Sequence, residues 1–361
     1  MSGVSRFSSR VPTRLNALGG RRAGTAASIL IIGGLSCLMV GSVWASGAVA
    51  QAAAPNSAVQ QGQLAIAAAE HVGHAGQAML LASARAGSRV VAVGDHGIIL
   101  LSDDNGRSFR QAKTVPIDST LTAVSFADDQ HGWAVGQWGV ILQSTDAGET
   151  WTLQRSDLKG DRPLFAVHFF DARHGVAVGL WSLVLSTVDG GRVWTQQQLL
   201  PPEGSKKADL NLLAMFADDH RNVYATAEKG MLLKSGDQGR TWAYLATGYK
   251  GSFWTGIALP DGVLLAAGLR GSLYRSADEG KTWSRIETNS KSSITALAHI
   301  GNEVVAVGLD GLELRSKDGG TSFSGTPRAD RLPLTSIVAA ADGRAVLFSR
   351  QGVVAGPMSE K

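Results

Sequence analysis

The chain has 361 residues and a formal net charge of +4. The excess lies at the N-terminus, because residues 1–50 contain five arginines and no acidic residue, which leaves 29 basic and 30 acidic residues elsewhere. A body so close to neutral excludes a nucleic-acid-binding protein that relies on a strong positive field.

Residues 1–50 resemble an export signal. A positively charged stretch ends at Arg21 and Arg22, an apolar run follows from 26 to 44, and a small-x-small cleavage pattern lies at 48–50. We therefore expect a signal peptide over 1–50 and a periplasmic or otherwise exported protein. Two alternatives stay open. The apolar run is long enough for an uncleaved inner-membrane anchor, and the arginine pair could belong to a twin-arginine signal.

Residues 51–76 are rich in alanine and glutamine, so we expect a tether there. Within 77–361 one motif, Ser/Thr-x-Asp-x-Gly-x-x-aromatic, occurs six times at spacings of 40–48 residues. Its recurring residues are Asp104, Gly106, Asp146, Gly148, Trp151, Asp189, Gly191, Trp194, Asp237, Gly239, Trp242, Asp278, Gly280, Trp283, Asp318 and Gly320. A period near 40 with short apolar strands is typical of propeller blades.

Each repeat contains four short apolar segments, called strands A to D. In the second repeat these are 121–126, 133–136, 140–144 and 151–155. The pattern predicts an all-β fold, a seven-bladed β-propeller of four-stranded blades with Asp-box turns between strands C and D. No Asp turn follows the seventh hairpin, at 350–352. Because a closed ring hides its sheet edges, we expect a segment within 65–76 to supply the missing strand.

The Asp turn is interpreted as structural. Its carboxylate can accept backbone N–H groups, its glycine allows a positive φ, and its final aromatic residue can pack between adjacent sheets. Six copies argue against a catalytic acid, which is needed once. Each turn has too few carboxylates for a strong calcium site, and no histidine pair has zinc-like spacing. We therefore expect no metal, no cofactor and no catalytic residue.

Blade geometry places the A–B and Asp turns on one face of the ring and the B–C turns on the other. Functional variation is expected on the B–C face, where a rigid frame holds the turns. The candidate partner-binding residues there are His96, Trp138, Trp181, Lys229, Arg270, Asp310 and Arg350. Trp138 and Trp181 fit an interface hot spot and packing over the central channel equally well. Lys229, Arg270 and Arg350 could form a basic arc beside Asp310, or could be solvated turn tips.

The six Asp turns resemble the Asp-box, or BNR, repeat of sialidases, sortilin-type receptors and the photosystem II stability and assembly factor family. Residues 126–151, F-A-D-D-Q-H-G-W-A-V-G-Q-W-G-V-I-L-Q-S-T-D-A-G-E-T-W, look most like the last family, and 169–194 repeat the phrase. The resemblance implies a seven-bladed, non-enzymatic propeller on the lumenal or periplasmic side of a membrane. An arginine patch belongs to the family picture, and only scattered residues such as Arg270 and Arg350 could stand in for it.

The favoured function is an exported scaffold, an assembly or stability factor whose partner is a membrane protein or an assembly intermediate of a membrane complex. We expect a monomer that touches the membrane through its partner or through an uncleaved N-terminal segment. The alternative is a carbohydrate- or peptide-binding propeller that uses Trp138 and Trp181. A sialidase-type glycoside hydrolase is disfavoured, because no arginine-bearing sialidase motif precedes the first Asp turn.

Overall fold

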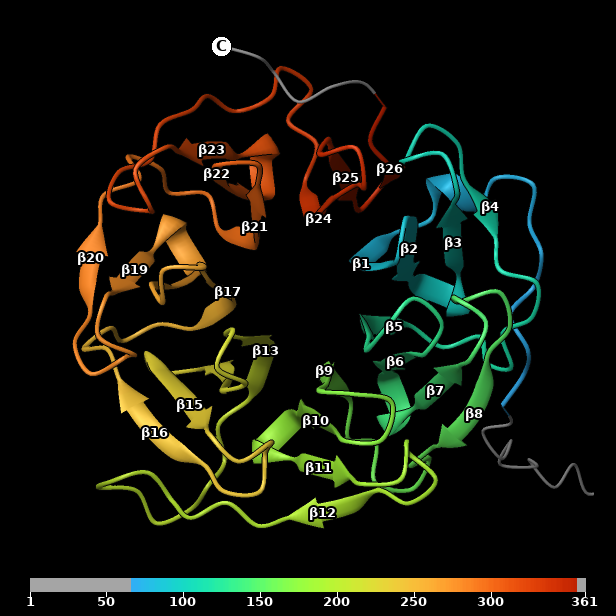
Figure 1. Ribbon diagram of the computed structural model, residues 1–361, viewed down its shortest axis with the longest axis horizontal. Helices are drawn as coiled ribbons and strands as arrows, with labels where there is room; N and C mark the ends of the chain where they lie inside the picture. Colours follow the sequence, from blue (N-terminus) through green and yellow to red (C-terminus); the bar gives the residue numbers. More distant parts are fainter. Residues whose placement is uncertain (1–65, 356–361) are drawn as a thin grey trace, which may run out of the picture. The chain divides into compact units, whose positions relative to one another are not determined.

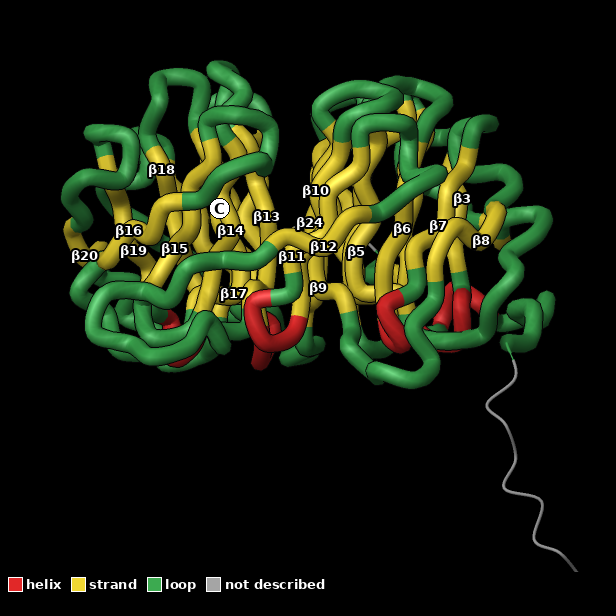
Figure 2. Tube along the Cα trace, turned by 90° about the horizontal axis from the view of Figure 1, so that it is seen from below, coloured by secondary structure: helices red, strands yellow, loops and turns green. Residues whose placement is uncertain are grey.

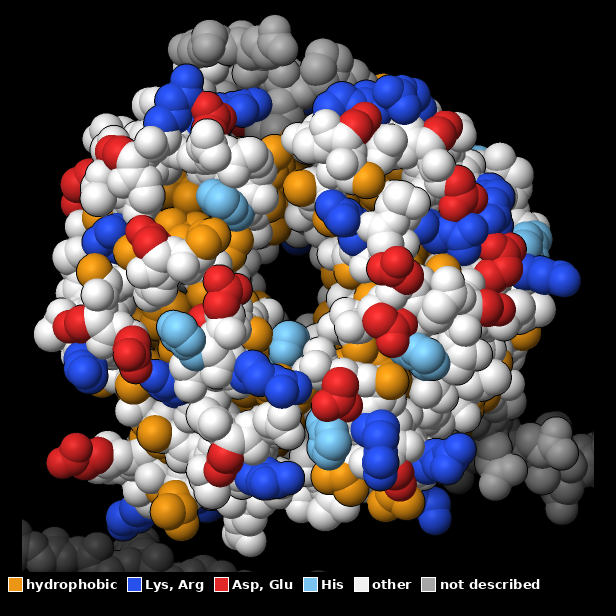
Figure 3. All heavy atoms as spheres, in the orientation of Figure 1, with side chains coloured by type: hydrophobic (Ala, Val, Ile, Leu, Met, Phe, Trp, Pro, Cys, Tyr) orange, Lys and Arg blue, Asp and Glu red, His pale blue; other side chains and the backbone are white. Residues whose placement is uncertain are grey.

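The computed structural model describes residues 66–355, which form a ring of seven antiparallel sheets around a central opening (Figure 1 and Figure 3). The expected seven-bladed β-propeller is confirmed. The expected signal peptide and most of the expected tether lie outside the described residues.

Each blade is one sheet whose strands follow one another from the centre of the ring outward (Figure 1). Blades one to three contain β1 (Leu80–Ala86), β2 (Arg89–Gly94), β3 (Ile99–Ser102), β4 (Arg110–Gln111), β5 (Leu121–Phe126), β6 (Gly132–Gly136), β7 (Ile141–Ser144), β8 (Thr152–Arg155), β9 (Leu164–Phe169), β10 (Gly175–Gly179), β11 (Val184–Thr187) and β12 (Thr195–Gln197). Blades four to seven contain β13 (Leu212–Ala217), β14 (Val223–Ala227), β15 (Met231–Ser235), β16 (Ala243–Ala246), β17 (Phe253–Ala258), β18 (Leu264–Gly268), β19 (Leu273–Ser276), β20 (Ser284–Ile286), β21 (Ile294–Ile300), β22 (Glu303–Gly308), β23 (Glu313–Ser316), β24 (Leu334–Ala339), β25 (Ala345–Ser349) and β26 (Gly352–Val353).

The second strand of each blade is deeply buried. Every residue of β6, β10, β14 and β18 is buried. Neighbouring blades cover both faces of such a strand, so apolar side chains are needed on both faces. This explains why these segments read as continuous runs of valine, alanine and leucine, without the alternation of a strand that faces water on one side.

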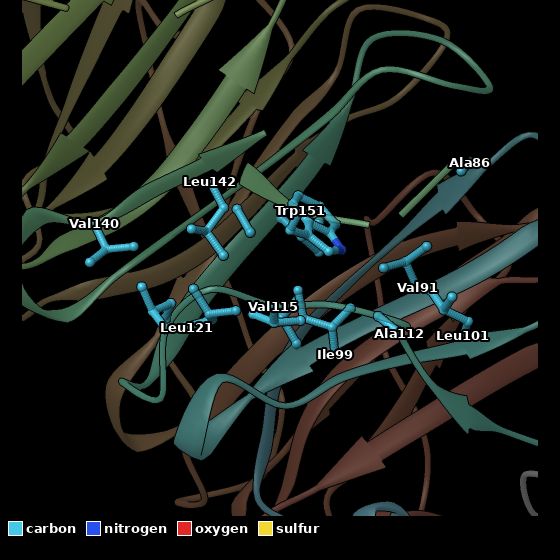
Figure 4. Close-up of a cluster of buried hydrophobic side chains, with 14 residues drawn as sticks. Ala86, Val91, Ile99, Leu101, Ala112, Val115, Leu121, Val140, Leu142 and Trp151 are labelled. Carbon is cyan, nitrogen blue, oxygen red and sulfur yellow. The ribbon is translucent and has the colours of Figure 1, made fainter. Parts of the chain in front are cut away.

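Blades one and two pack through a cluster of buried side chains (Figure 4). Val91 and Leu101 come from blade one, and Leu142 and Trp151 come from blade two. Trp151, the last residue of its Asp turn, is only 3% exposed, and its Nε1 donates to Gly148 O at 2.9 Å. The aromatic residue of the turn therefore buries a large apolar surface between adjacent sheets and keeps its polar atom paired.

The Asp turns share one hydrogen-bond pattern, for which Asp146 is the example. Ser144 Oγ donates to Asp146 Oδ1 at 2.8 Å, and Gly148 N–H donates to Ser144 Oγ at 2.9 Å. The N–H and hydroxyl of Thr150 donate to the two carboxylate oxygens at 2.9 and 2.6 Å. Equivalent bonds from the turn surround Asp104, Asp189, Asp237, Asp278 and Asp318. Each carboxylate thus accepts hydrogen bonds from residues of its own turn.

The glycine of each Asp turn has a φ between 79° and 88°. This left-handed region is strained for a side chain with a Cβ atom and accessible to glycine. The glycine requirement of the motif is therefore a backbone requirement.

The prediction that a segment within 65–76 supplies the last strand of blade seven is wrong for the described residues 66–76. They form no strand, although the helical turn η1 (Ala75–Gln77) contacts β26. Ala69 N–H donates to Val115 O at 3.0 Å, and Val72 N–H donates to Gln111 Oε1 at 3.2 Å. The segment runs along the outer part of blade one because it finds its backbone partners there.

Blades one and seven close the ring by direct packing. β1 lies against β24, and Thr335 Oγ1 donates to Leu80 O. Phe109 meets Phe348 edge to face, with ring centroids 5.7 Å apart. Blade six has a single bridge, between Arg315 and Ser324, in place of a regular fourth strand. Among the described residues, blade seven has three strands.

Candidate functional site

The B–C turns lie together on one face of the ring. Figure 2 shows the short helical turns gathered on a single side of the molecule, away from the loops of the other face. The B–C turns among them are η2 (Asp95–Gly97), η3 (Gln137–Gly139), η4 (Leu180–Ser182), η5 (Leu269–Gly271) and η6 (Leu309–Gly311). Residues 228–230 join β14 to β15 in the same position of blade four. We call this surface the B–C face.

Except in blade four, each B–C turn is anchored by a backbone hydrogen bond to the residue just before the first strand of its blade. Gln137 N–H, for example, donates to Thr120 O at 3.0 Å. The preceding Gly136 is in extended conformation, and a Cβ atom there would lie 2.1 Å from Thr120 O. The same close approach occurs at Gly94, Gly179, Gly268 and Gly308, with distances of 1.9–2.3 Å. The glycine before the turn permits this anchoring, and the turn tip is consequently held by backbone atoms.

Six of the seven candidate residues occupy the same position in their turns, and all six have left-handed backbone conformation. Their φ values are 52° for His96, 58° for Trp138, 52° for Trp181, 57° for Lys229, 56° for Arg270 and 57° for Asp310. Arg350 differs, because its blade uses a shorter hairpin in which Ser349 pairs with Gly352. A left-handed conformation costs a residue with a Cβ atom about 1–2 kcal/mol. All six equivalent positions accept this cost, and they carry five kinds of side chain.

The two tryptophans of the B–C face differ in exposure. Trp138 is half-buried and packs against the core cluster between blades one and two. Trp181 is 62% exposed, although it occupies the equivalent position of the next blade. Packing accounts for Trp138, whereas no neighbouring side chain covers most of Trp181.

The turn of Trp181 is also hydrogen-bonded to the following blade. Its backbone N–H donates to Asn211 Oδ1 at 3.1 Å. Asn211 in turn donates from its own N–H and from Nδ2 to Glu228, at 3.0 and 3.2 Å. Glu228 belongs to the B–C turn of blade four and directly precedes Lys229. The tips of blades three and four are therefore fixed relative to each other.

The basic tips do not form one continuous arc. Lys229 and Arg270 lie on the neighbouring blades four and five, but Arg350 lies on blade seven, beyond Asp310 of blade six. Asp310 Oδ2 accepts a hydrogen bond from Ser292 Oγ at 2.8 Å. The acidic tip therefore separates Arg350 from the other two.

A pair of arginines that sequence reasoning missed lies beside Trp138. Asp157 N–H donates to Trp138 O at 2.6 Å, and Arg155 and Arg162 each lie 3.4 Å from Asp157 Oδ2. The N–H of Gly160 and the two guanidinium groups lower the pKa of Asp157. Two cations share one carboxylate here. The three residues are close in sequence, within 155–162, so the cluster could have been noticed there. Its place beside the turn tip of Trp138 is what only the structure shows.

The histidines at A–B turns have a local role. His131 Nδ1 lies 2.8 Å from Asp128 Oδ2, and His174 Nδ1 lies 2.9 Å from Asp171 Oδ2. Both pairs sit at equivalent places in blades two and three. In residues 66–355 there is no group of three or more histidine, cysteine, aspartate or glutamate residues arranged to hold a metal ion.

The fold defines the class of protein, which is an all-β, seven-bladed propeller. A family model described as "Photosynthesis system II assembly factor YCF48" matches residues 111–201 and 154–251. The resemblance to a photosystem II assembly factor-like family of β-propellers is thereby confirmed.

Two solved structures share the architecture. One is "YCF48 bound to D1 peptide", with 17% sequence identity, coverage of 80% of this chain and 98% of that chain, and a TM-score of 0.64. The other is "YCF48 from Cyanidioschyzon merolae", with 17% identity, 80% and 97% coverage and a TM-score of 0.62. At this identity the two structures support the fold. No curated protein matches the chain.

Proposed function

We propose that the chain is an exported, non-catalytic scaffold that assists the assembly or stability of a membrane protein complex, and that it docks on its partner through the B–C face. The family match supports an assembly or stability factor. One relative of the same fold has been solved with a D1 peptide bound. A membrane protein, or an assembly intermediate that contains one, is therefore the proposed partner.

The six left-handed tips carry this proposal. Glycine would adopt their backbone conformation without the steric cost, yet each position has a side chain. Strained backbone of this kind persists where the surrounding structure holds it and where the side chain has a use. The six tips carry five kinds of side chain, as expected for a surface that recognises one particular partner.

Trp181 is the proposed anchor of the docking surface. Its large exposed ring stands on a turn that is held by Asn211 and, through it, by Glu228. Tryptophan is enriched among the residues that dominate binding energy, and a rigid mount reduces the entropy lost on binding. Lys229 and Arg270 on the next two blades would supply cationic contacts near this anchor.

Export is proposed from the N-terminal sequence. The apolar run at 26–44, whether cleaved or kept as an anchor, would place the propeller on the exported side of a membrane. In the described range, 66–355, no helix is long and apolar enough to cross a membrane.

Tyr224 is a poor candidate for the tyrosine nucleophile that a sialidase-type activity needs. Tyr224 is fully buried, stacks on Phe216 and donates to Asp218 Oδ2 at 3.2 Å. Burial, followed by the charge of Asp218, raises the pKa of its hydroxyl well above the ordinary value. Such a group is poorly suited to nucleophilic attack on a sugar.

Replacing Trp181 with glycine is expected to reduce capture of the membrane partner at least about tenfold, because a central aromatic anchor is lost. The measurement is affinity capture from detergent-solubilised membranes of the source organism, with quantification of the co-purified membrane proteins. The unfolding free energy should stay unchanged or rise by up to about 1 kcal/mol, since glycine relieves the left-handed strain.

Val193→Ala is the matched control. Val193 is also 62% exposed on blade three, but it belongs to the Asp turn on the opposite face. Capture should be unaffected by this change. An absence of any specific membrane partner for the unaltered protein, or an equal loss with Val193→Ala, would count against the proposal.

A further inference from the structure

Among residues 66–355, the outer edge of blade seven has no strand paired with it. Figure 1 shows outer strands β4, β8, β12, β16 and β20 on blades one to five, and none on blade seven. Within 66–355, β26 pairs with β25 alone. The preceding segment, 69–72, does not fill the gap, because it is bonded to blade one.

The backbone of this edge points outward. Val354 N–H donates inward to Leu347 O at 3.1 Å. Successive peptide groups of a strand face opposite sides, so the N–H and C=O of Val353 and Ala355 face away from β25. An exposed row of such groups is a template for another strand.

A cavity of about 910 Å³ lies beside this edge. Blade seven contributes Val346 and Val353 to its wall, blade six contributes Ile300 and Val305, and the Asp turn of blade one contributes Asn105. The cavity therefore lies between blades six and seven and reaches the Asp turn of blade one, and its lining includes the edge residues Val353 and Ala355. Its apolar walls suit alternate side chains of an extended segment.

Three arginines line the cavity, Arg107, Arg315 and Arg344. Arg315 is paired with Glu303 at 2.9 Å, so the other two are the cations that a ligand would meet. Arg107 and Arg344 share a single carboxylate, Asp342, at 3.7 and 2.9 Å. Neither arginine is deeply buried, since their side chains are 60% and 51% exposed. Both therefore keep donors for an additional carboxylate.

One further polar atom supports a ligand at this place. Asn105 Oδ1 is buried without a hydrogen-bond partner, and Asn105 is part of the cavity wall. Arg344 holds the same residue through a bond from Nη2 to Asn105 O at 3.0 Å. An unsatisfied buried acceptor beside an open strand edge fits a backbone N–H of an added strand.

We propose that this edge binds an extended, acidic segment of a partner polypeptide, which adds to blade seven as its fourth, antiparallel strand. Backbone groups of the segment pair with Val353 and Ala355, its apolar side chains enter the cavity, and its carboxylates meet Arg107 and Arg344. Residues 356–361 carry one acidic and one basic side chain, so they do not supply the complementary charge. This site lies at the rim of the ring and is independent of docking on the B–C face.

The test uses the full-length chain and a fluorescein-labelled decapeptide that alternates valine and glutamate. We expect saturable binding by fluorescence anisotropy, and a loss of affinity of at least about tenfold for Arg107→Glu. A decapeptide that alternates valine and lysine should not bind. The glutamate peptide should also fail when alternate amides are N-methylated, because strand pairing needs their N–H groups.

Arg221→Glu is the matched control, because Arg221 is 61% exposed and has a similarly long ion pair, 3.8 Å to Asp171, at a distant turn. Its peptide affinity should equal that of the unaltered chain. No binding of the glutamate peptide, equal binding of the lysine peptide, or unchanged affinity in Arg107→Glu would overturn the proposal. Slow hydrogen exchange at Val353 in the free full-length chain would overturn it too, by showing that a segment of the chain itself covers the edge.

Discussion

Replacing Trp133 with alanine is expected to lower the free energy of unfolding by about 3–5 kcal/mol. Trp133 lies in β6 with no exposed surface. It stacks on Phe169 of blade three with ring centroids 3.4 Å apart and an interplanar angle of 6°. Its Nε1 donates to Gly190 O at 3.3 Å, but this carbonyl also accepts from Gln143 and Gln154, so the main loss on substitution is the packing that the cavity between two blades forfeits.

Urea unfolding followed by circular dichroism measures this effect. Trp181→Gly is the control, because it removes the same ring from an exposed site and should change the unfolding free energy by about 1 kcal/mol or less. A loss below about 1 kcal/mol for Trp133→Ala would show that the packing between blades two and three contributes little to stability.

Acidification is expected to destabilise the propeller through its six Asp turns. Hydrogen bonds from the hydroxyl and N–H of Thr282 lower the pKa of Asp278 from 3.8 to about 2. Burial alone would raise the pKa of Asp146, but bonds from Thr150 and Ser144 outweigh it and lower that pKa. The pKa values of Asp104, Asp189, Asp237 and Asp318 are lowered by the same kind of hydrogen bonds.

The direction in which stability changes with pH follows from proton binding in the folded and unfolded states. A carboxyl group whose pKa is lower in the folded state binds fewer protons there than in the unfolded state. Its stabilising contribution is present above the unfolded pKa, about 4, and is lost as the pH falls toward the folded value. The urea midpoint should therefore fall steeply between about pH 4 and pH 2, because six groups act in the same direction.

Asp146→Asn tests the assignment of this effect to the turns. The amide keeps one accepting oxygen, and its NH₂ group cannot accept the hydroxyl bond from Thr150 that Oδ2 accepts, so we expect a loss of about 1–2 kcal/mol at pH 7 and a shallower dependence on pH. Glu203→Gln makes the same charge change in an exposed connection and should leave both unaltered. Equal pH profiles for Asp146→Asn and the unaltered chain would contradict a role of the turn carboxylate.

Part of the docking surface could be predicted from the sequence. The spacing of the glycine turns placed His96, Trp138, Trp181, Lys229, Arg270 and Asp310 at equivalent positions of successive blades, and the structure puts them at one left-handed position. Their exposure could not be predicted in the same way. Trp138 and Trp181 have the same place in the repeat, but the core beside Trp138 accepts part of its ring and the core beside Trp181 does not.

The sequence by itself determined the fold. Four short apolar strands in a repeat of about 40 residues indicate a propeller, in which every blade buries both faces against neighbouring blades. The Asp turn carries its own hydrogen-bond partners within a few residues, so its structure could also be read locally. The closure of the ring was decided by tertiary structure alone. Residues 69–72 have no strand pattern of their own, and the N–H groups of Ala69 and Val72 bond to Val115 and Gln111 of blade one. Among residues 66–355, the edge at Val353 is consequently left without a strand beside it. The arginines near this edge come from segments far apart in the sequence, and such contacts leave no periodic signal in the chain.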